Sequence, residues 1–537
     1  MSQAGSVPAS AEEPTAVRTD VRHAGHSSRR RWPAEVWPPV VVVLFPVLVV
    51  SLAGGWHLLS HPFWLDELFT YHLATSRSLP ALFRALAAGV DMNPPALHLL
   101  LRYVAPLAGG VGPTGYRVVT FCLVVVATLF IYGTLRPGFG RLPAAAGALV
   151  LWGSPMVASQ AFEARFYPLW LAALAGFIYF RSRQGPAGGR WYVEVAVAAS
   201  AVVVCTTHYF GIISLALVVA GDAAVGRRRL GEVFRRNLSA LAGPVALACC
   251  LPLLVSQREA TPVATWLLEP TWADVRLGFQ QFLMTPGQQA AFWLWPAVAV
   301  YGVGRWSSVR EALGALGSHG GLLATGLMLP AIFVFSFLVQ PAQMGRYAIV
   351  AFLAAAPLVA VAVKLLPTSL RLVAVAGLFV GALTAHWTIR SFHDGQSAAL
   401  NTALLQLDAA AGAYDGPILF GGWAGLMALQ YERPGLAGRF VLLDRPNDVI
   451  APDDKMARLT RDLARVVLAH YPQIARLEQP EDVINASNDR LLLCGHGAGL
   501  GWFIRQLQDA GYALEWFSGE VGVARSGSQR SQSEQTP

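Results

Sequence analysis

Charge is the scarcest property of this sequence. Only 13% of the 537 residues are charged and 54% are hydrophobic, whereas soluble domains carry about twice that share of charged residues. This deficit excludes an ordinary soluble domain and predicts a membrane protein with several spans. The formal net charge is +8, but most basic residues are arginines in short segments between apolar runs. Their placement indicates membrane orientation rather than affinity for nucleic acid.

Cysteine is also scarce, with five residues in the whole chain. Four of them, Cys122, Cys205, Cys249 and Cys250, fall in apolar runs, and Cys494 lies in the polar C-terminal part. This distribution predicts neither a disulfide framework nor a metal-ligand pattern.

The sequence contains many apolar stretches that are long enough to cross a membrane. Residues 1–35 lack apolar periodicity and are predicted to be a disordered cytoplasmic tail. Arg29, Arg30 and Arg31 then precede an apolar run at 36–59. That run is too long for a signal-peptide core and has no small-residue cleavage site behind it. We interpret it as an uncleaved first span whose N-terminus is cytoplasmic by the positive-inside rule.

The segment 95–110 decides the remaining topology. It is apolar, yet it is shorter than the ~20 residues that a span needs, and it carries His98 and Arg102 one helical turn apart. If it crosses the membrane, the arginine-bearing segments 136–141, 181–190 and 227–236 fall outside, against the positive-inside rule. If it lies in the outer interface with His98 and Arg102 toward the lipid headgroups, all three segments are cytoplasmic. We adopt the second topology.

This choice predicts a polytopic α-helical membrane protein with about eleven transmembrane helices. After the first span, the expected spans are 116–135, 142–160, 166–181, 191–206, 209–225, 238–256, 289–304, 320–340, 345–363 and 371–389. The polar segment 61–115 becomes the first outer loop.

That loop contains two adjacent carboxylates, Asp66 and Glu67, set among Phe63, Trp64 and Phe69. A carboxylate beside bulky apolar groups at a bilayer surface is partly desolvated, which favours its acting as a proton acceptor. The pair therefore predicts a site of chemistry. The alternative is a solvated loop in which two acidic residues begin a helix.

The same topology places four other polar clusters on the outer side, at 163–167, 207–209, 257–289 and 343–347. Two of them contain an arginine, Arg165 or Arg346, at a span end on the face where positive residues are rare. A guanidinium there could bind a lipid phosphate or pyrophosphate through several N–H donors. The alternatives are that the arginines reach toward lipid headgroups or pair with carboxylates such as Glu163. A lone histidine at a helix end, such as His208, is more often simply hydrogen-bonded than catalytic.

Together these landmarks resemble the C-type glycosyltransferase (GT-C) superfamily over residues 36–390. The nearest branch is the bacterial relatives of the protein O-mannosyltransferases and of the lipid A aminoarabinose transferase. The resemblance rests on the order, spacing and common sidedness of Leu65-Asp66-Glu67, Asp91-Met92-Asn93-Pro94-Pro95, Glu163-Ala164-Arg165-Phe166-Tyr167, Thr207-His208-Tyr209 and Gly345-Arg346-Tyr347.

The resemblance implies an inverting enzyme that takes a sugar from a polyprenyl-phosphate donor and transfers it at the outer face. It implies Asp66 as general base and Glu67 as the residue that orients the site or the acceptor. The donor phosphate would be bound by Arg165, Arg346 and Tyr347. Substrate contacts would come from Asp91, Asn93, Glu163, Tyr167, His208 and Tyr209. Asn93 stands where family members often have His or Lys, which leaves a proton-transfer or phosphate-binding role at that position in doubt.

The partners implied are membrane lipids, the lipid-linked sugar donor and a glycan, lipid or protein acceptor, and nucleic acid is not among them. The donor is a substrate, and no cofactor is assigned. A divalent metal remains possible, with Glu67 as a conceivable ligand.

The composition turns polar after Arg390. Short apolar runs alternate with helical stretches over 391–525, which predicts a small soluble α/β domain outside the membrane. Residues 526–537 are predicted to be a disordered tail. The turn from Cys494 to Gly499 could hold an anion at a helix N-terminus, although roofing the outer cavity or selecting the acceptor is the favoured role for this domain.

A transporter or flippase of lipid-linked precursors is the alternative function. Transporters keep ionisable groups near the middle of the bilayer along the substrate path. Here the charged clusters lie at span ends on one face, and Glu194 and Asp222 lie near cytoplasmic ends. The sequence therefore favours a transferase in the bacterial inner membrane.

Overall fold

The fold is seen in a computed structural model. The structure describes residues 33–63, 65–184, 190–226, 237–260, 271–273, 276, 306–339, 341–342, 345–412, 416–420, 432–443, 475–477, 490–494, 501–516 and 521–526. The predicted span at 289–304, residues 495–499 of the predicted glycine-rich turn and most of both predicted tails lie outside these residues. Helix α1 begins at Pro33 and strand β6 ends at Ser526, so the innermost residues of each tail are in regular structure.

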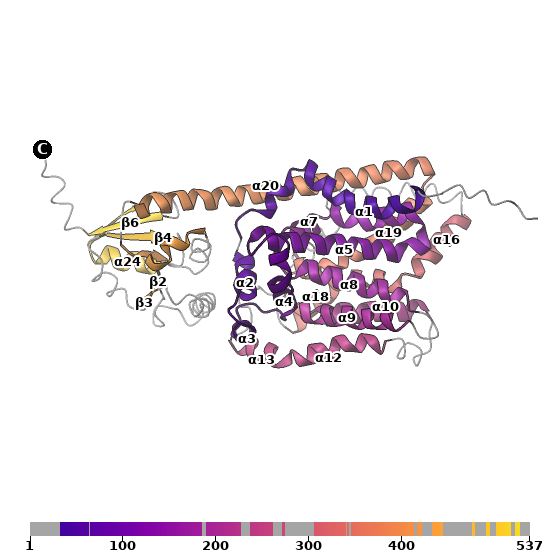
Figure 1. The fold of residues 1–537 in the computed structure, drawn as a ribbon, viewed down its shortest axis with the longest axis horizontal. Helices are drawn as coiled ribbons and strands as arrows, with labels where there is room; N and C mark the ends of the chain where they lie inside the picture. Colours follow the sequence, from indigo (N-terminus) through magenta and orange to yellow (C-terminus); the bar gives the residue numbers. More distant parts are fainter. Residues whose placement is uncertain are drawn as a thin grey trace, which may run out of the picture. The chain divides into compact units, whose positions relative to one another are not determined.

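Among the described residues, the regular elements up to Gly412 are all helices (Figure 1). The elements up to the middle of this part are α1 (Pro33–Leu52), η1 (Gly55–Leu59), α2 (Leu65–Ala74), α3 (Leu79–Ala87), α4 (Ala96–Val104), η2 (Ala105–Leu107), α5 (Pro113–Phe139), α6 (Arg141–Leu149), η3 (Val150–Gly153), α7 (Pro155–Ala161) and α8 (Tyr167–Ser182). Those that follow are α9 (Trp191–Thr207), α10 (Gly211–Gly226), η4 (Ser239–Leu241), α12 (Ala242–Cys249), α13 (Leu251–Ala260), α16 (Trp306–Gly317), α17 (Gly320–Ala324), η5 (Thr325–Leu327), α18 (Met328–Leu338), η6 (Gly345–Ala354), α19 (Ala355–Leu365) and α20 (Thr368–Gly412).

Five helical stretches among the described residues are long and apolar enough to cross a membrane. They are Pro113–Phe139, Ser239–Glu259, Gly320–Leu338, Gly345–Leu365 and Thr368–Gly395. Several other predicted spans correspond to shorter apolar helices, including Val40–Leu52, Trp191–Thr207 and Gly211–Val225. The structure therefore supports a helical membrane protein, and the larger number of spans stays a prediction.

The predicted span at 142–160 is wrong as a single helix. It is broken between Gly153 and Pro155, where two helical pieces meet at 76°. Ser154 has extended dihedral angles because the residue before a proline is disfavoured in the helical region. Its side chain then accepts a hydrogen bond from the backbone N–H of Val157 and caps α7. The two pieces cross only if they are counted as one bent span.

The helices pack closely around α5, which contacts α6, α7 and α8. At the crossing of α6 with α19, Gly147 has no room for a side chain, because a Cβ there would collide with the carbonyl oxygen of Ala356. Large aromatic side chains such as Trp152 and Trp170 are fully buried in this core. Tight packing of this kind holds the loops at the helix ends in fixed positions.

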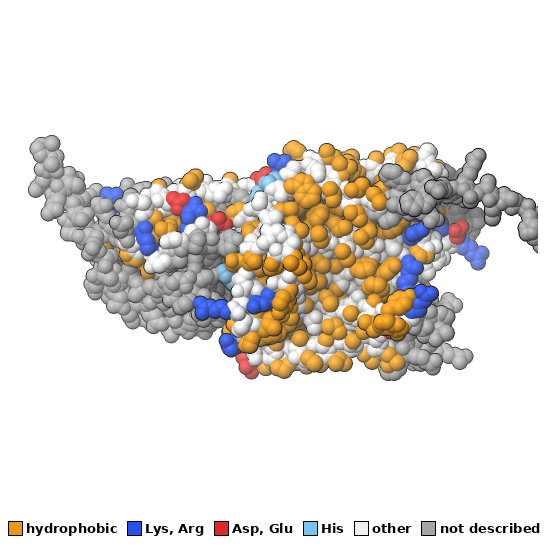
Figure 2. Space-filling view, viewed as in Figure 1, with side chains coloured by type: hydrophobic (Ala, Val, Ile, Leu, Met, Phe, Trp, Pro, Cys, Tyr) orange, Lys and Arg blue, Asp and Glu red, His pale blue; other side chains and the backbone are white. Residues whose placement is uncertain are grey.

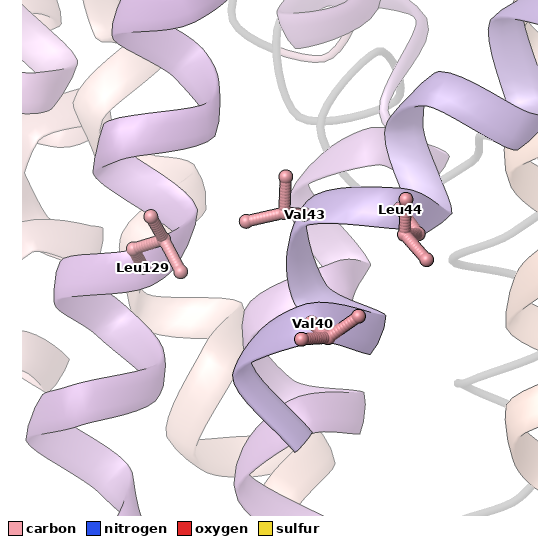
Figure 3. A pocket seen from close by; sticks show the side chains of 4 residues that line it. All are labelled: Val40, Val43, Leu44 and Leu129. Carbon is pink, nitrogen blue, oxygen red and sulfur yellow. The ribbon is translucent and has the colours of Figure 1, made fainter. Parts of the chain in front are cut away.

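The outward faces of these helices are largely hydrophobic (Figure 2). Side chains such as Val245, Phe337 and Leu372 are more than three-fifths exposed, as expected for helices that face lipid. A hollow of about 380 Å³ lies on this surface between α1 and α5, and Figure 3 shows the side chains that line it. It is lined by Val40, Val43, Leu44 and Leu129 and therefore offers no group for chemistry.

The C-terminal part forms a six-stranded sheet of order β3-β2-β1-β4-β6-β5. The strands are β1 (Ile418–Phe420), β2 (Phe440–Leu443), β3 (Ala475–Leu477), β4 (Arg490–Cys494), β5 (Tyr512–Trp516) and β6 (Val521–Ser526). The first four pair in parallel, and the last two are antiparallel. Helix α24 (Gly501–Asp509) buries Phe503 and Leu507 with residues of the sheet. The structure thus contains a sheet with a helix packed on it in this part of the chain, and a separate α/β domain outside the membrane stays a prediction.

Helix α20 runs without interruption through residue 390, where the composition changes. Residues 391–412 are polar but rich in Ala, Leu and Gln, which are strong helix formers. The change from apolar to polar therefore does not end the helix. Near its C-terminus, α20 contacts β4 and β6, so the predicted boundary at 390 falls inside one element.

Candidate active site

The acidic pair lies in the first turn of α2. Carboxylates are favoured there because the N–H groups that begin a helix carry partial positive charge. The two side chains differ in environment, since Glu67 is fully buried and the side chain of Asp66 is 21% exposed. Of the pair, only Asp66 is open to a substrate. Trp64, predicted to lie beside it, is outside the described residues.

Glu67 is held by Arg117, which lies 50 residues away on α5. Arg117 donates from Nε to Oε1 at 2.9 Å and from NH2 to Oε2 at 2.5 Å. The backbone N–H of Ala164 donates to the same Oε1 at 2.7 Å. Glu67 thus joins α2, α5 and the 162–166 loop at the start of α2, where Asp66 also lies.

Two arginines from distant parts of the chain meet at Asp66. Arg346 NH1 donates to Asp66 Oδ2 at 3.0 Å, across 280 residues of sequence. The Nε atom of Arg165 lies 4.0 Å from the same oxygen. Its NH1 donates to the carbonyl oxygen of Asp66 at 2.9 Å and to Thr70 Oγ1 at 3.2 Å. Asp66 and Arg346 therefore share one side of the helical bundle.

Both arginines keep an unsatisfied donor. Within the described part of the chain, the buried Nε atoms of Arg165 and Arg346 have no hydrogen-bond partner. Buried polar groups in folded proteins are nearly always paired, so an orphaned donor calls for an explanation. Two guanidinium donors beside one cluster fit an anionic ligand with several oxygens, such as a phosphate.

Asp91 is the second carboxylate at this cluster. Its Oδ2 accepts from Arg165 NH1 at 3.1 Å, and its Oδ1 accepts from Asn93 Nδ2 at 2.5 Å. Burial on its own raises the pKa of Asp91, but the neighbouring Arg165 and the hydrogen bonds bring the pKa below its usual value. For Arg165, burial alone would lower the pKa, and Asp91 and Asp66 raise it. These groups therefore form a fixed charged network.

The predicted exposure of His98 to lipid headgroups is wrong. His98 is 1% exposed, and its Nε2 lies 3.6 Å from Asp91 Oδ2. Burial lowers its pKa to about 4, so the ring is neutral near pH 7. Arg102 also points inward, donating to the carbonyl oxygens of Ala74 and Ser76 at 3.0 and 2.6 Å. The polar face of α4 is turned toward α2 because the buried network supplies its partners.

Comparison with known proteins identifies the architecture. No family model matches the sequence, and no curated protein is similar to it in sequence. The structure is similar to two crystal structures of ArnT from Cupriavidus metallidurans, one in the apo state and one bound to undecaprenyl phosphate. The TM-scores are 0.58 and 0.56, at 14% identity, and each match covers 90% of this chain and 97% of the other. The chain has a GT-C fold.

An oligosaccharyltransferase from Archaeoglobus fulgidus is similar over 92% of this chain and 73% of its own. The identity is 13% and the TM-score 0.43, which is too low to support an argument from that structure.

An aromatic wall flanks the arginines in this GT-C fold. The guanidinium carbon of Arg346 lies 5.9 Å from the centre of the Tyr167 ring, and Tyr167 and Tyr347 are 6.3 Å apart. His208 stacks between Phe166 and Trp170 at 4.7 and 4.9 Å. Its Nδ1 accepts a hydrogen bond from a backbone N–H, and burial lowers its pKa to about 3. His208 is therefore neutral and cannot supply positive charge to a phosphate.

Glu163 belongs to the neighbouring turn. Its two oxygens accept from Ser159 Oγ at 2.6 Å and Gln160 Nε2 at 2.8 Å. Burial raises its pKa. The ion pairs of Arg165 are with Asp66 and Asp91 rather than with Glu163, and Arg165 is 7% exposed, so it does not reach toward lipid.

The remaining predicted residue, Tyr209, is linked to the cluster by Gln257, which sequence reasoning missed. Tyr209 donates to Gln257 Oε1 at 2.7 Å, and Gln257 Nε2 donates to the carbonyl oxygen of Asp91 at 2.9 Å. All the predicted site residues thus lie in one region of the GT-C fold. Arg117 was missed as well, because it reads as one arginine near the start of an apolar run.

Removing Arg117 is expected to destabilise the protein strongly. In Arg117→Met, Glu67 would remain buried without its counter-charge, at a cost of about 3–5 kcal/mol. The measurement is thermal unfolding of the purified chain in detergent. Adding Glu67→Gln to Arg117→Met should recover part of the loss, because the uncompensated charge is then removed.

The matched control is Glu311→Gln, which breaks an ion pair with Lys364 whose carboxylate side is 73% exposed. Exposed pairs contribute roughly 0–1 kcal/mol, so this variant should unfold close to the wild type. Equal melting temperatures for Arg117→Met and Glu311→Gln would contradict a stabilising role for the buried pair.

Proposed function

We propose that this chain is an integral membrane glycosyltransferase. It transfers a sugar from a polyprenyl-phosphate donor to an envelope acceptor, with inversion, at the outer face of the bacterial inner membrane. The observation that carries the proposal is the partly exposed Asp66 carboxylate beside Arg165 and Arg346, whose buried Nε atoms have no hydrogen-bond partner among the described residues. The similarity in fold to an ArnT that binds undecaprenyl phosphate supports the class of donor.

The arginines would hold the donor phosphate. Arg165 and Arg346 offer their Nε–H groups, and Tyr347 is an electrostatic neighbour of both. As the bond between sugar and phosphate breaks, negative charge grows on the leaving phosphate. Fixed donors aimed at such charge are often worth ~10²–10³ in rate each. Because phosphate leaves as a stable anion, no general acid is needed.

Asp66 would be the base that removes the acceptor's hydroxyl proton. Its Oδ2 accepts a hydrogen bond from Arg346 NH1. An arriving phosphate competes for that guanidinium and frees Asp66 to accept a proton. Attack by the acceptor oxygen opposite the leaving phosphate is a single displacement, which inverts the anomeric carbon.

The other groups would shape the sugar pocket. Asp91, Asn93, Glu163, Tyr167, His208 and Tyr209 would contact the substrates or hold the residues that do. Glu67 is a poor metal ligand here, because both of its oxygens face Arg117 and a second cation would be repelled. The proposed topology has about eleven spans, a cytoplasmic N-terminus and the α/β sheet outside.

The test uses the full-length chain in proteoliposomes with a panel of radiolabelled polyprenyl-phosphate sugars and bacterial envelope acceptors. We expect label to appear on an acceptor and polyprenyl phosphate to be released in equal amounts. If instead the labelled donor crosses the bilayer with its sugar–phosphate bond intact, the chain is a flippase and the transferase proposal fails.

A further inference from the structure

A cluster of two histidines and one carboxylate lies outside the candidate active site. His57 is on η1, His61 lies in the loop after it, and Asp394 is on α20. One nitrogen of each ring and one carboxylate oxygen lie within 4.8 Å of one another. His57 Nε2 is 2.7 Å and His61 Nε2 is 3.7 Å from Asp394 Oδ1.

The hydrogen bonding of His57 is not satisfied by a neutral ring. Its Nδ1 lies 2.6 Å from the carbonyl oxygen of Gly54, and its Nε2 lies 2.7 Å from Asp394 Oδ1. Both neighbours are acceptors, whereas a neutral imidazole has one N–H. Donation from Nδ1 to Gly54 leaves the lone pair of Nε2 facing a carboxylate. A cation between these two atoms removes the conflict.

That pattern is the one by which proteins orient a metal-binding histidine. One ring nitrogen binds the ion while the other donates its hydrogen to a backbone carbonyl. Here Gly54 supplies the carbonyl, from a backbone conformation with φ of +65° that suits glycine. The turn after α1 thus fixes the direction of the His57 ring.

The distances fit a small transition-metal ion. Zinc bonds of about 2.0–2.2 Å to nitrogen and oxygen place tetrahedral ligand atoms about 3.3 Å apart. The distances of 2.7 and 3.7 Å from the ring nitrogens to Asp394 Oδ1 lie on either side of that value, and all three ligand atoms lie within 4.8 Å of one another. Side-chain shifts of roughly 1–1.5 Å would therefore bring the three atoms to tetrahedral spacing. Two imidazoles and a carboxylate suit zinc and related ions, whereas calcium and magnesium prefer oxygen ligands alone.

The site is also accessible. The side chains of His57, His61 and Asp394 are 36%, 16% and 42% exposed, which lets an ion enter and leaves room for a water as fourth ligand. Arg390 donates from Nε to the other oxygen of Asp394 at 3.3 Å. That contact places positive charge near the site and leaves Oδ1 as the ligand atom.

We propose that His57, His61 and Asp394 form a binding site for one divalent transition-metal ion, with Zn²⁺ the best fit. The ion would join α20 to the segment 57–62. That segment holds Arg117, because the carbonyl oxygens of His61 and Pro62 accept from its guanidinium at 2.7 and 3.0 Å. The metal site would therefore stabilise the segment 57–62, which binds Arg117 and so holds α2 in place, from outside the active site.

The test uses the full-length chain, purified in detergent without a histidine tag and stripped with a chelator. Co²⁺ is the probe, because its visible absorption reports low-coordinate binding to nitrogen and oxygen. We expect one Co²⁺ per chain, displaced by Zn²⁺, and a Zn²⁺-dependent rise in melting temperature. His61→Ala and Asp394→Asn should each weaken Co²⁺ binding at least ~10-fold.

The control is His72→Ala, which removes a histidine on α2 that is not in the cluster. It should bind Co²⁺ as the wild type does. If the stripped wild-type chain shows no Co²⁺ absorption and no Zn²⁺ effect on melting, the proposal fails and the cluster is an ion pair between a doubly protonated His57 and Asp394. Unchanged Co²⁺ affinity in a folded His61→Ala variant would overturn it equally. The wild-type titration decides the question even if a variant does not fold.

Discussion

Asp66→Asn is expected to lower sugar transfer by ~10²–10⁴-fold, because that is the range that a positioned base contributes to the rate. Asparagine keeps the shape of the side chain and can still lie beside Arg346, but it cannot take a proton from the acceptor. The measurement is turnover of a polyprenyl-phosphate sugar in vesicles, with membrane insertion and melting temperature checked on the same preparation.

Asp408→Asn is the matched control. Asp408 pairs with Arg433, and both side chains are about one-third exposed or more, so the change should alter stability and turnover little. Near-normal turnover in Asp66→Asn would remove Asp66 as the base. A loss of turnover shared by Asp408→Asn would show that the assay reports general damage.

Arg346→Ala is expected to weaken use of the donor by ~10²–10³-fold in kcat/KM, which is the range for loss of one fixed donor group at developing charge. The acceptor KM should change little, because the guanidinium faces Asp66 and the proposed phosphate position rather than the acceptor. Binding of polyprenyl phosphate alone, measured on the purified chain, separates donor affinity from chemistry.

Arg346→Lys supplies the comparison for charge. It keeps the positive charge but loses the planar donors that bind two phosphate oxygens together, so it should restore binding only in part. Arg346 is a cleaner probe than Arg165, because Arg165 also holds Asp91 and the carbonyl oxygen of Asp66. Unchanged affinity for polyprenyl phosphate in Arg346→Ala would count against a phosphate site.

Much of the site could be predicted from the sequence because the positive-inside rule places its residues on the same side of the membrane. By the positive-inside rule, the arginines of the short loops predict an orientation of the helices, and that predicted orientation puts Asp66, Arg165 and Arg346 on one side. The structure brings Arg346 to 3.0 Å from Asp66. The pairing itself could not be foreseen, because nothing local in the sequence says which of two carboxylates meets a given arginine.

Other features escaped prediction for physical reasons. The buried partner of Glu67 lies 50 residues away, and long-range pairing leaves no periodic signal. His98 was placed toward lipid headgroups because a short apolar helix with a polar face resembles an interfacial helix, whereas a buried Asp91 supplies its partner. The break at Pro155 did carry a local signal, since a Gly-Ser-Pro run disfavours a continuous helix.

All five N–H donors of the Arg117 guanidinium make hydrogen bonds to neighbouring groups around the start of α2. They go to both oxygens of Glu67 and to the carbonyl oxygens of Leu58, His61 and Pro62. A swing of this segment would strand several buried donors, at roughly 1–3 kcal/mol each. The segment 58–62, which precedes Asp66, is therefore expected to stay fixed rather than to move during substrate entry. Any movement that admits an acceptor to Asp66 would have to occur in another part of the protein.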